Sequence, residues 1–194
     1  PHIPHGSTPR FWSSNIVPEA GQAMPYRLDV GIRSPGTSTP LVAFQATPSS
    51  FEGAPCWSPD GALLAFHASI PGVSSRAQIY RKPLAGGALV RVAPQDSLDQ
   101  FLPDWSPRGN LLAYEGRRSN GTSNVWICNP NGGGPTQLTN LPVCATSPAF
   151  QPDGQGVAYL RFDGSTWSLR WIAIDGTGDR LVASIGTLGT GVAR

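Results

Sequence analysis

The side chains with the greatest chemical reactivity are few and widely spaced. The chain holds three cysteines, Cys56, Cys128 and Cys144, and none of them form a Cys-x-x-Cys pair. An odd number of cysteines at these spacings argues against a zinc site and allows at most one internal disulfide, whose pairing the sequence leaves open. A nucleophilic cysteine also needs a neighbouring base. We therefore expect neither thiol catalysis nor a metal site.

Histidine, the commonest catalytic base, is equally scarce. His2 and His5 lie in the N-terminal arm, where a His-x-x-His pair could contact a metal but more often marks a solvated tail. His67 is the only histidine outside that arm, so we expect no Ser-His-Asp triad. The chain also lacks a Gly-x-Ser-x-Gly turn, a His-Glu-x-x-His helix and a phosphate-binding glycine-rich loop. We expect no catalytic residue and no cofactor.

The composition indicates a turn-rich, all-β chain. Of 194 residues, 23 are Gly and 20 are Pro, and only 13% are charged. Gly and Pro recur too often for long helices, while 39% hydrophobic residues suffice for a core. A net charge of +2 with scattered arginines argues against a nucleic-acid partner, and no apolar run reaches the roughly 20 residues of a membrane span. The chain begins at Pro1, so we expect a processed or excised portion of something longer.

A seven-residue segment that recurs along the chain is the most informative feature. Its aromatic residues, Trp57, Trp105 and Phe150, are 48 and 45 residues apart. A faint upstream copy has Trp12, 45 residues before Trp57. The three clear copies are Pro55-Cys56-Trp57-Ser58-Pro59-Asp60-Gly61, Pro103-Asp104-Trp105-Ser106-Pro107-Arg108-Gly109 and Pro148-Ala149-Phe150-Gln151-Pro152-Asp153-Gly154. A period of this length is typical of repeat architectures.

The residues after each segment repeat as well. Three short β-branched or aromatic runs follow, with glycine turns between them. Together with the segment itself, they predict four strands in each unit of about 46 residues. In the first unit these runs are 63–66, 78–80 and 89–92. The runs are apolar on both alternating faces, which is expected of a sheet sandwiched between two others. We therefore predict a β-propeller of four-stranded antiparallel blades.

The segment Pro-x-Trp-Ser-Pro-Asp-Gly, followed by Leu-Ala-Phe, Ile-Tyr and Gly-Gly, closely resembles the repeat of TolB-like, WD-type propellers. The same repeat occurs in the propellers of tricorn-type and prolyl-oligopeptidase-type peptidases. The resemblance covers roughly residues 51–183 and implies a fold more than an activity. Such propellers usually close with six or more blades, whereas this chain has about four repeats, which indicates a partial ring or a compact four-bladed ring.

We divide the chain accordingly. Residues 1–50 are expected to form an N-terminal arm and a degenerate first blade, interrupted by many prolines. Residues 51–194 are expected to form three repeats, at about 51–97, 98–143 and 144–194. A partial ring leaves open sheet faces, so we expect two chains to complete a ring or to associate head to tail.

Two groups of repeat residues admit both a structural and a functional interpretation. Trp57, Trp105 and Phe150 could form a row that binds sugar rings, but aromatics at one fixed position of every blade are better explained by packing between blades. Asp60 and Asp153 suggest glycosidase acids or calcium ligands. Arg108 replaces them in the middle copy, and a required ligand would not be replaced by a cation. We therefore assign the aspartates to turns.

Long, variable loops are the remaining place for a contact surface. Antiparallel connectivity puts the loops between the second and third strands, and between consecutive blades, on one face of the propeller. Binding is usually built on such loops. A plain solvated rim is the alternative for each residue. The candidate binding residues on this face are Arg76, Gln95, Asp96, Asp99, Arg117, Arg118 and Asn120.

These observations favour a non-catalytic propeller scaffold that binds a protein partner or itself. The low-charge surface, rich in Ser, Thr and Gly, suggests an extracytoplasmic location, periplasmic or secreted. One alternative is the gating propeller of a serine peptidase whose catalytic domain lies outside this chain. A second alternative is a carbohydrate-binding propeller.

Overall fold

The computed structural model describes residues 10–12, 30–33, 41–44 and 51–187, and every regular element among them is a strand. The expectations placed on His2 and His5 fall outside these residues. Strands β1 (Arg10–Trp12), β2 (Val30–Arg33) and β3 (Leu41–Phe44) form a three-stranded sheet in the order β1-β2-β3. This sheet lies where the sequence predicts a degenerate first blade.

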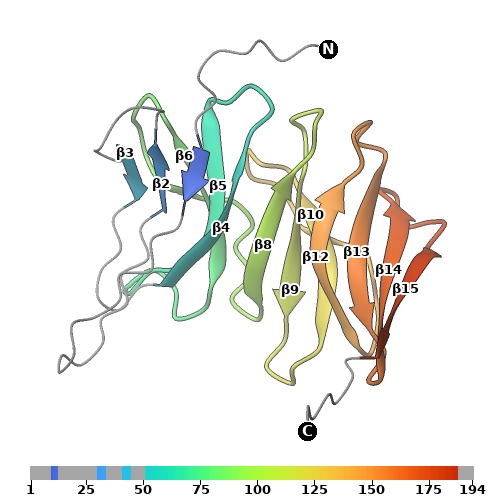
Figure 1. Cartoon of the computed structure of the whole chain (residues 1–194). Helices are drawn as coiled ribbons and strands as arrows, with labels where there is room; N and C mark the ends of the chain where they lie inside the picture. The colour runs from blue at the N-terminus through green and yellow to red at the C-terminus, as the bar shows by residue number, and fades with distance from the viewer. Residues whose placement is uncertain (1–9, 13–29, 34–40, 45–50, 188–194) are drawn as a thin grey trace, which may run out of the picture.

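Three four-stranded blades follow the small sheet, stacked in a row that curves as in a propeller (Figure 1). The first blade consists of β4 (Phe51–Trp57), β5 (Leu63–Ser69), β6 (Gln78–Pro83) and β7 (Val90–Arg91). The second consists of β8 (Asp99–Trp105), β9 (Leu112–Arg117), β10 (Ser123–Cys128) and β11 (Thr136–Gln137). The third consists of β12 (Cys144–Phe150), β13 (Gly156–Phe162), β14 (Thr166–Ala173) and β15 (Arg180–Thr187).

Within each blade every strand pairs antiparallel with the next one along the chain. The second and third blades are joined at one position, where Ser123 of β10 pairs in parallel with Cys144 of β12. The prediction of an all-β chain built from antiparallel propeller blades is confirmed.

Tight turns between the first two strands of each blade account for the Pro-Asp-Gly segments. In the first blade the Gly61 N–H donates to the Ser58 carbonyl at 2.9 Å, and Gly61 has a φ of 70° that favours glycine. The Asp60 carboxylate accepts from the Ser58 hydroxyl and from the Ala62 N–H at 3.0 Å. These bonds lower the pKa of Asp60. Asp153 accepts from the Gln155 N–H at 2.9 Å, so both aspartates serve turns, as predicted.

Apolar side chains on alternating faces of each blade form separate layers of core. Ala65 and Ile79 of the first blade pack against Leu112 and Tyr114 of the second. Ala113 of the second blade joins the next layer, which also holds Val125, Val157 and Tyr159. The opposite face of the first blade holds a third layer of Leu64, Phe66, Ala68 and Tyr80. Alternate residues of one strand therefore support two neighbouring layers, which explains why the strands are apolar on both faces.

The repeated aromatic residues lie in these layers. Trp105 is 7% exposed and belongs to the layer between the first and second blades. Phe150 packs against the layer between the second and third blades, and Trp57 against the layer on the far side of the first blade. The prediction that this position packs blades together is confirmed for Trp105 and Phe150.

The innermost strand of each blade contains a bulge that the sequence did not suggest. Ala54, Leu102 and Ser147 precede the proline of the repeated segment and have φ values of 46°, 52° and 53°. The pairing of β4, β8 and β12 with their neighbours shifts register at the same place. A left-handed conformation costs a non-glycine residue roughly 1–2 kcal/mol. The surrounding blade packing holds this conformation in all three copies.

The exposed member of this set permits a direct test. Replacing Ser147 by isoleucine is expected to lower the free energy of unfolding by about 1–2 kcal/mol, because a β-branched side chain fits the left-handed region poorly. Ser147→Gly is expected to change that free energy by less than about 0.5 kcal/mol, since relief of strain and added chain entropy offset each other. Urea denaturation measures both. Ser75→Ile, at an exposed serine without positive φ, is the control and should also be nearly neutral.

Candidate functional site

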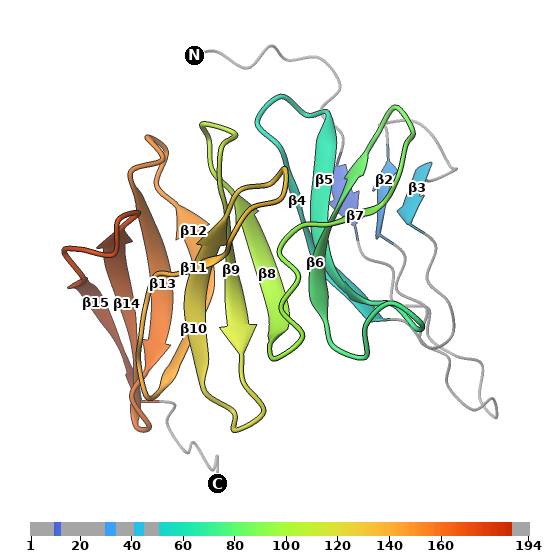
Figure 2. The same ribbon diagram turned by 180° about the vertical axis from the view of Figure 1, so that it is seen from behind.

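The candidate contact residues lie on the loops that follow β5, β7 and β9, or, for Asp99 and Arg117, at the strand ends next to these loops. Because neighbouring strands of a blade run in opposite directions, these loops emerge on one face of the blade row (Figures 1 and 2). The structure brings some of the seven candidates together and separates the others.

Arg76 and Asp99 join two blades. The Arg76 guanidinium lies 2.9 Å from the Asp99 carboxylate, and the other oxygen of Asp99 accepts from the Ala77 N–H at 3.1 Å. Both side chains are about one-third exposed. The pair anchors the loop after β5 to the start of β8. These two candidates therefore stabilise the structure, in addition to any role in contacting a partner.

Gln95 and Asp96 lie in the crossover from the first blade to the second. The Gln95 side-chain oxygen accepts from the Tyr114 hydroxyl at 2.9 Å and from the Gln100 amide at 3.2 Å. Asp96 is 84% exposed and lies 2.5 Å from the Arg91 guanidinium. Gln95 thus belongs to a hydrogen-bond network inside the protein. Asp96 lies at the solvent-exposed side of that network, next to Arg91.

Arg117 is the candidate whose position is most firmly fixed. Its guanidinium donates twice to one oxygen of Glu115, at 2.8 and 3.0 Å, and lies 4.8 Å from the centre of the Phe101 ring. Glu115 is completely buried, and its other oxygen accepts from the Thr146 hydroxyl of the third blade. The Arg117 side chain is still 48% exposed. The protein therefore presents a preorganised, half-exposed cation at the end of β9.

Arg118 and Asn120 continue from Arg117 into the loop before β10. The Arg118 N–H donates to the Thr122 carbonyl at 2.9 Å, and Arg118 is exposed. The Asn120 side-chain oxygen accepts from the Thr122 N–H at 3.0 Å and from its hydroxyl at 2.8 Å. Asn120 thus shapes the turn, and Arg117 and Arg118 form a short basic edge, which we call the Arg117–Arg118 edge.

Sequence reasoning missed several buried polar residues behind this face. Gln78, Gln100, Glu115 and His67 are between 0% and 4% exposed. Gln78, Glu115 and His67 are flanked along the chain by apolar residues or glycine, and that contrast was the available signal for these three. The side chains of Gln78 and Gln100 hold the loops in place through hydrogen bonds to other residues of the chain.

A hollow of about 290 Å3 lies where the three innermost strands approach one another. Its lining consists of Ala54, Pro55, Cys56, Leu102, Pro103, Asp104, Ser147 and Pro148. Burial raises the pKa of the Cys56 thiol and that of the Asp104 carboxyl. The Asp104 carboxylate accepts from the Phe150 N–H at 2.6 Å, so it connects two blades. No activated nucleophile results from this arrangement, because a buried thiol with a raised pKa remains protonated.

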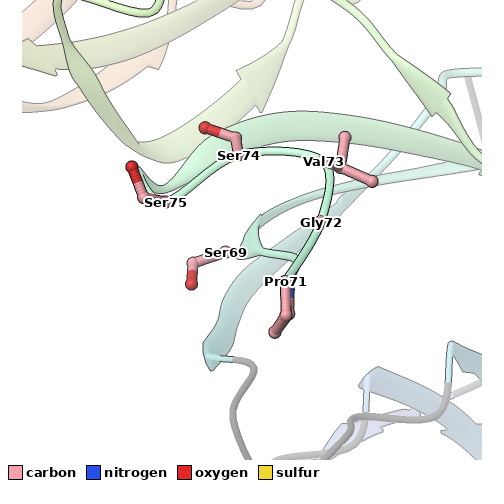
Figure 3. A pocket seen from close by; sticks show the side chains of 6 residues that line it. All are labelled: Ser69, Pro71, Gly72, Val73, Ser74 and Ser75. Atoms are coloured by element: carbon pink, nitrogen blue, oxygen red, sulfur yellow. The ribbon is translucent and has the colours of Figure 1, made fainter.

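Two further hollows lie elsewhere on the blades. One, of about 460 Å3, is formed by a single loop after β5, with Ser69, Pro71 and Val73 among its lining residues (Figure 3). Another, of about 390 Å3, lies by the Pro-Asp-Gly turns of the first two blades and includes Asp60, Trp105 and Arg108. The first has no acidic or basic side chain in its lining. In the second, the Ser58 hydroxyl donates to Asp60 as part of the Pro-Asp-Gly turn.

The three cysteines are all free, so the single disulfide that the sequence permits is not formed among them. The Cys144 sulfur lies 3.1 Å from the Ser123 hydroxyl. The described residues contain no group of three or more His, Cys, Asp or Glu side chains placed to hold a metal ion. They also include no helix long and apolar enough to cross a membrane.

Comparison with known families shows what this arrangement of blades is. A family model described as the TolB beta propeller domain matches residues 44–188. The chain belongs to the TolB β-propeller family. The resemblance drawn from the repeated segment is thereby confirmed.

Solved structures agree on the fold. A putative TolB from Agrobacterium tumefaciens matches 91% of this chain and 61% of its own, with a TM-score of 0.72 and 18% identity. TolB from Acinetobacter baumannii matches 86% of this chain and 38% of its own, with a TM-score of 0.65 and 23% identity. At these identities the likeness shows the fold alone.

A curated relative is named as a peptidase. The uncharacterized peptidase YuxL of Bacillus subtilis is 28% identical over 108 residues, which cover 53% of this chain and 16% of YuxL. This chain thus spans less than two-thirds of the relatives named, and matches YuxL over a small part of its length.

Proposed function

We propose that this TolB-type propeller is a non-catalytic module that binds a protein partner outside the cytoplasm, with the Arg117–Arg118 edge as its contact surface. The observation that carries the proposal is the fixed geometry of Arg117 described above. A cation already held in place loses little side-chain entropy on binding. Arginine also binds carboxylates in a bidentate manner. The partner surface is therefore expected to be acidic.

The test compares charge removal on two faces of the propeller. Arg117→Ala combined with Arg118→Ala is expected to reduce retention of a specific protein from the host's extracytoplasmic fraction by at least tenfold. Arg108→Ala is the control, because Arg108 is also exposed but lies at a turn between the first two strands of its blade. Quantitative mass spectrometry of the retained proteins provides the measurement. Equal retention by the wild type and the double variant would contradict the proposal.

The gating propeller of a serine peptidase is the second candidate. It is favoured by the match to YuxL and by the fold likeness to a puromycin-hydrolyzing peptidase of Mycobacterium tuberculosis, with a TM-score of 0.62 over 89% of this chain. The flanking genomic sequence discriminates the two candidates. A Gly-x-Ser-x-Gly turn followed by Asp and His in the same reading frame would favour the peptidase, and its absence would favour the free-standing module.

The carbohydrate-binding alternative depended on an exposed aromatic row. Trp105, the central member of that row, is 7% exposed and packs between blades. The described residues therefore give this alternative no support.

A further inference from the structure

The Pro-Asp-Gly turns of neighbouring blades lie next to one another, with a gap at each boundary between blades. The first gap, between the first and second blades, is the hollow of about 390 Å3 that includes Asp60, Trp105 and Arg108. These turns join the first two strands of each blade, so they lie at the opposite end of the blades from the Arg117–Arg118 edge. The second gap, between the second and third blades, is equivalent by the repeat but is filled differently.

The second gap is occupied by an arginine of the chain itself. The Arg108 Nε donates to the Asp153 carbonyl at 2.7 Å, so this side chain crosses from its own blade to the next. Its methylene groups lie over Gly154, because a Cβ placed on that glycine would come within 3.1 Å of the Arg108 Cγ and 3.2 Å of the Cδ. An arginine side chain therefore fits the space between two such turns.

The first gap has the same kind of turn on either side but no arginine in it. Asp60 stands at the position of Arg108 in the repeat, and its short side chain bonds within its own turn. The space over Gly109 is more open, since a Cβ placed there would lie 4.0 Å from Pro59, its nearest described neighbour outside the adjoining residues. The Arg108 carbonyl is the counterpart of the Asp153 carbonyl, and no described residue donates a hydrogen bond to it.

Asp60 supplies a negative charge in the first gap. Its Oδ1 accepts from the Ser58 hydroxyl and the Ala62 N–H, and these bonds lower the pKa of the carboxyl, which keeps it ionised. Its Oδ2 accepts no hydrogen bond from the described residues. Asp153 differs, because its Oδ2 accepts from the Gln151 amide at 3.1 Å. Of these two turn aspartates, Asp60 is therefore the one with a carboxylate oxygen left for a ligand.

We propose that the first gap binds an arginine side chain of a protein partner, which lies over Gly109 as Arg108 lies over Gly154. Its guanidinium donates to the Asp60 Oδ2 and to the Arg108 carbonyl, since both residues line this hollow. Arginine suits two such acceptors better than lysine, because its planar group carries several N–H donors in a fixed arrangement. The site lies on the opposite face from the Arg117–Arg118 edge, so it does not depend on the contact proposed there.

The test is a titration of the isotope-labelled chain with Nα-acetyl-L-argininamide, followed by NMR. Two groups report on the first gap: the Gly109 amide, and the Trp105 indole N–H, which donates to the Gly109 carbonyl at 3.3 Å. Both resonances are expected to shift until the site is saturated. Single exposed ion pairs are weak, so saturation is expected at millimolar concentration. The citrulline analogue of the probe, in which a neutral urea replaces the guanidinium, is expected to leave both resonances unchanged.

Three variants make the test specific to this gap. Asp60→Asn is expected to raise the dissociation constant of the probe at least about threefold, since it removes the charge but keeps an oxygen for the turn. Asp153→Asn is the matched control, because it makes the same change in the turn of the third blade and is expected to leave that constant unchanged. Arg108→Asp gives the second gap the residue that the first gap has, so a second probe molecule is expected to bind and to shift the Gly154 amide.

Any of four outcomes would contradict the proposal. These are a wild type whose Gly109 and Trp105 resonances do not shift, equal binding of the arginine and citrulline probes, an Asp60→Asn variant that binds as tightly as the wild type, and an Arg108→Asp variant without a second site. Free arginine distinguishes a protein partner from an amino-acid ligand. Tighter binding of free arginine than of the blocked probe would show a site for the amino acid, and the proposed partner would be wrong.

Discussion

Replacing Gln78 by leucine is expected to lower the free energy of unfolding by about 3–4 kcal/mol. The Gln78 amide is 0% exposed and donates to the Leu98 carbonyl at 2.8 Å and to the Gln95 carbonyl at 3.2 Å. Its oxygen accepts from the Arg91 guanidinium at 2.7 Å. Leucine preserves the volume but leaves these partners unsatisfied. Each buried unsatisfied group costs roughly 1–3 kcal/mol, and more when it is charged.

Chemical denaturation monitored by tryptophan fluorescence measures this loss. Gln155→Leu is the matched control, because Gln155 is exposed and its substitution should change the free energy of unfolding by less than about 0.5 kcal/mol. If Gln78→Leu proves as mild as the control, then the crossover between the first two blades does not depend on this network. The loop-face candidate Gln95, which takes part in the same network, would then be free to act in binding.

Lowering the pH from 6.5 to 4 is expected to remove about 3 kcal/mol of stability through His67. Burial lowers the pKa of His67 from 6.5 to about 4. His67 is 4% exposed, and its Nδ1 lies 3.5 Å from the Leu102 N–H, an arrangement that suits neutral imidazole. Because the unfolded chain takes up the proton at higher pH than the folded chain, stability is complete above about pH 6.5 and falls as the pH decreases towards 4. The size follows from about 1.4 kcal/mol per pKa unit.

Denaturation curves across this pH range provide the measurement. His67→Gln is expected to be less stable at pH 7 but to lose much less stability between pH 6.5 and 4. Asp104 opposes the trend, because burial raises its pKa and its contribution to stability therefore increases as the pH falls. Asp104→Asn is the control. It removes the contribution of Asp104, so the pH dependence that remains can be assigned to His67. A wild type with flat stability between pH 6.5 and 4 would show that His67 is not held neutral.

Much of the blade structure could be predicted from the repeated segment. Trp57, Trp105 and Phe150 mark the end of each innermost strand because proline and glycine flank them at fixed offsets, and the chain must turn there. The apolar runs that follow predict the second strands for the same local reason. Asp60 and Asp153 could be assigned to turns because a cation replaces them in the middle copy.

The candidate site was less predictable, because its bonds join residues far apart in the sequence. The sequence indicates only that the loop candidates lie on one face of the propeller. Nothing local to Arg117 indicates that its guanidinium packs on Phe101, or that Thr146, 31 residues after Glu115, completes the link to the next blade. The left-handed conformations of Ala54, Leu102 and Ser147 were also not predictable, since residues before proline ordinarily adopt extended conformations.

The sequence by itself determined the class of fold, the length of the repeat and the places where the chain turns, because turn chemistry and strand periodicity act over a few residues. Only the tertiary structure decided which polar residues are buried and which of them link one blade to the next. Those properties depend on neighbours brought together across the blades. In particular, nothing in the sequence around Glu115 shows that it is buried, and only the tertiary structure shows that its carboxylate accepts a hydrogen bond from Thr146 of the next blade.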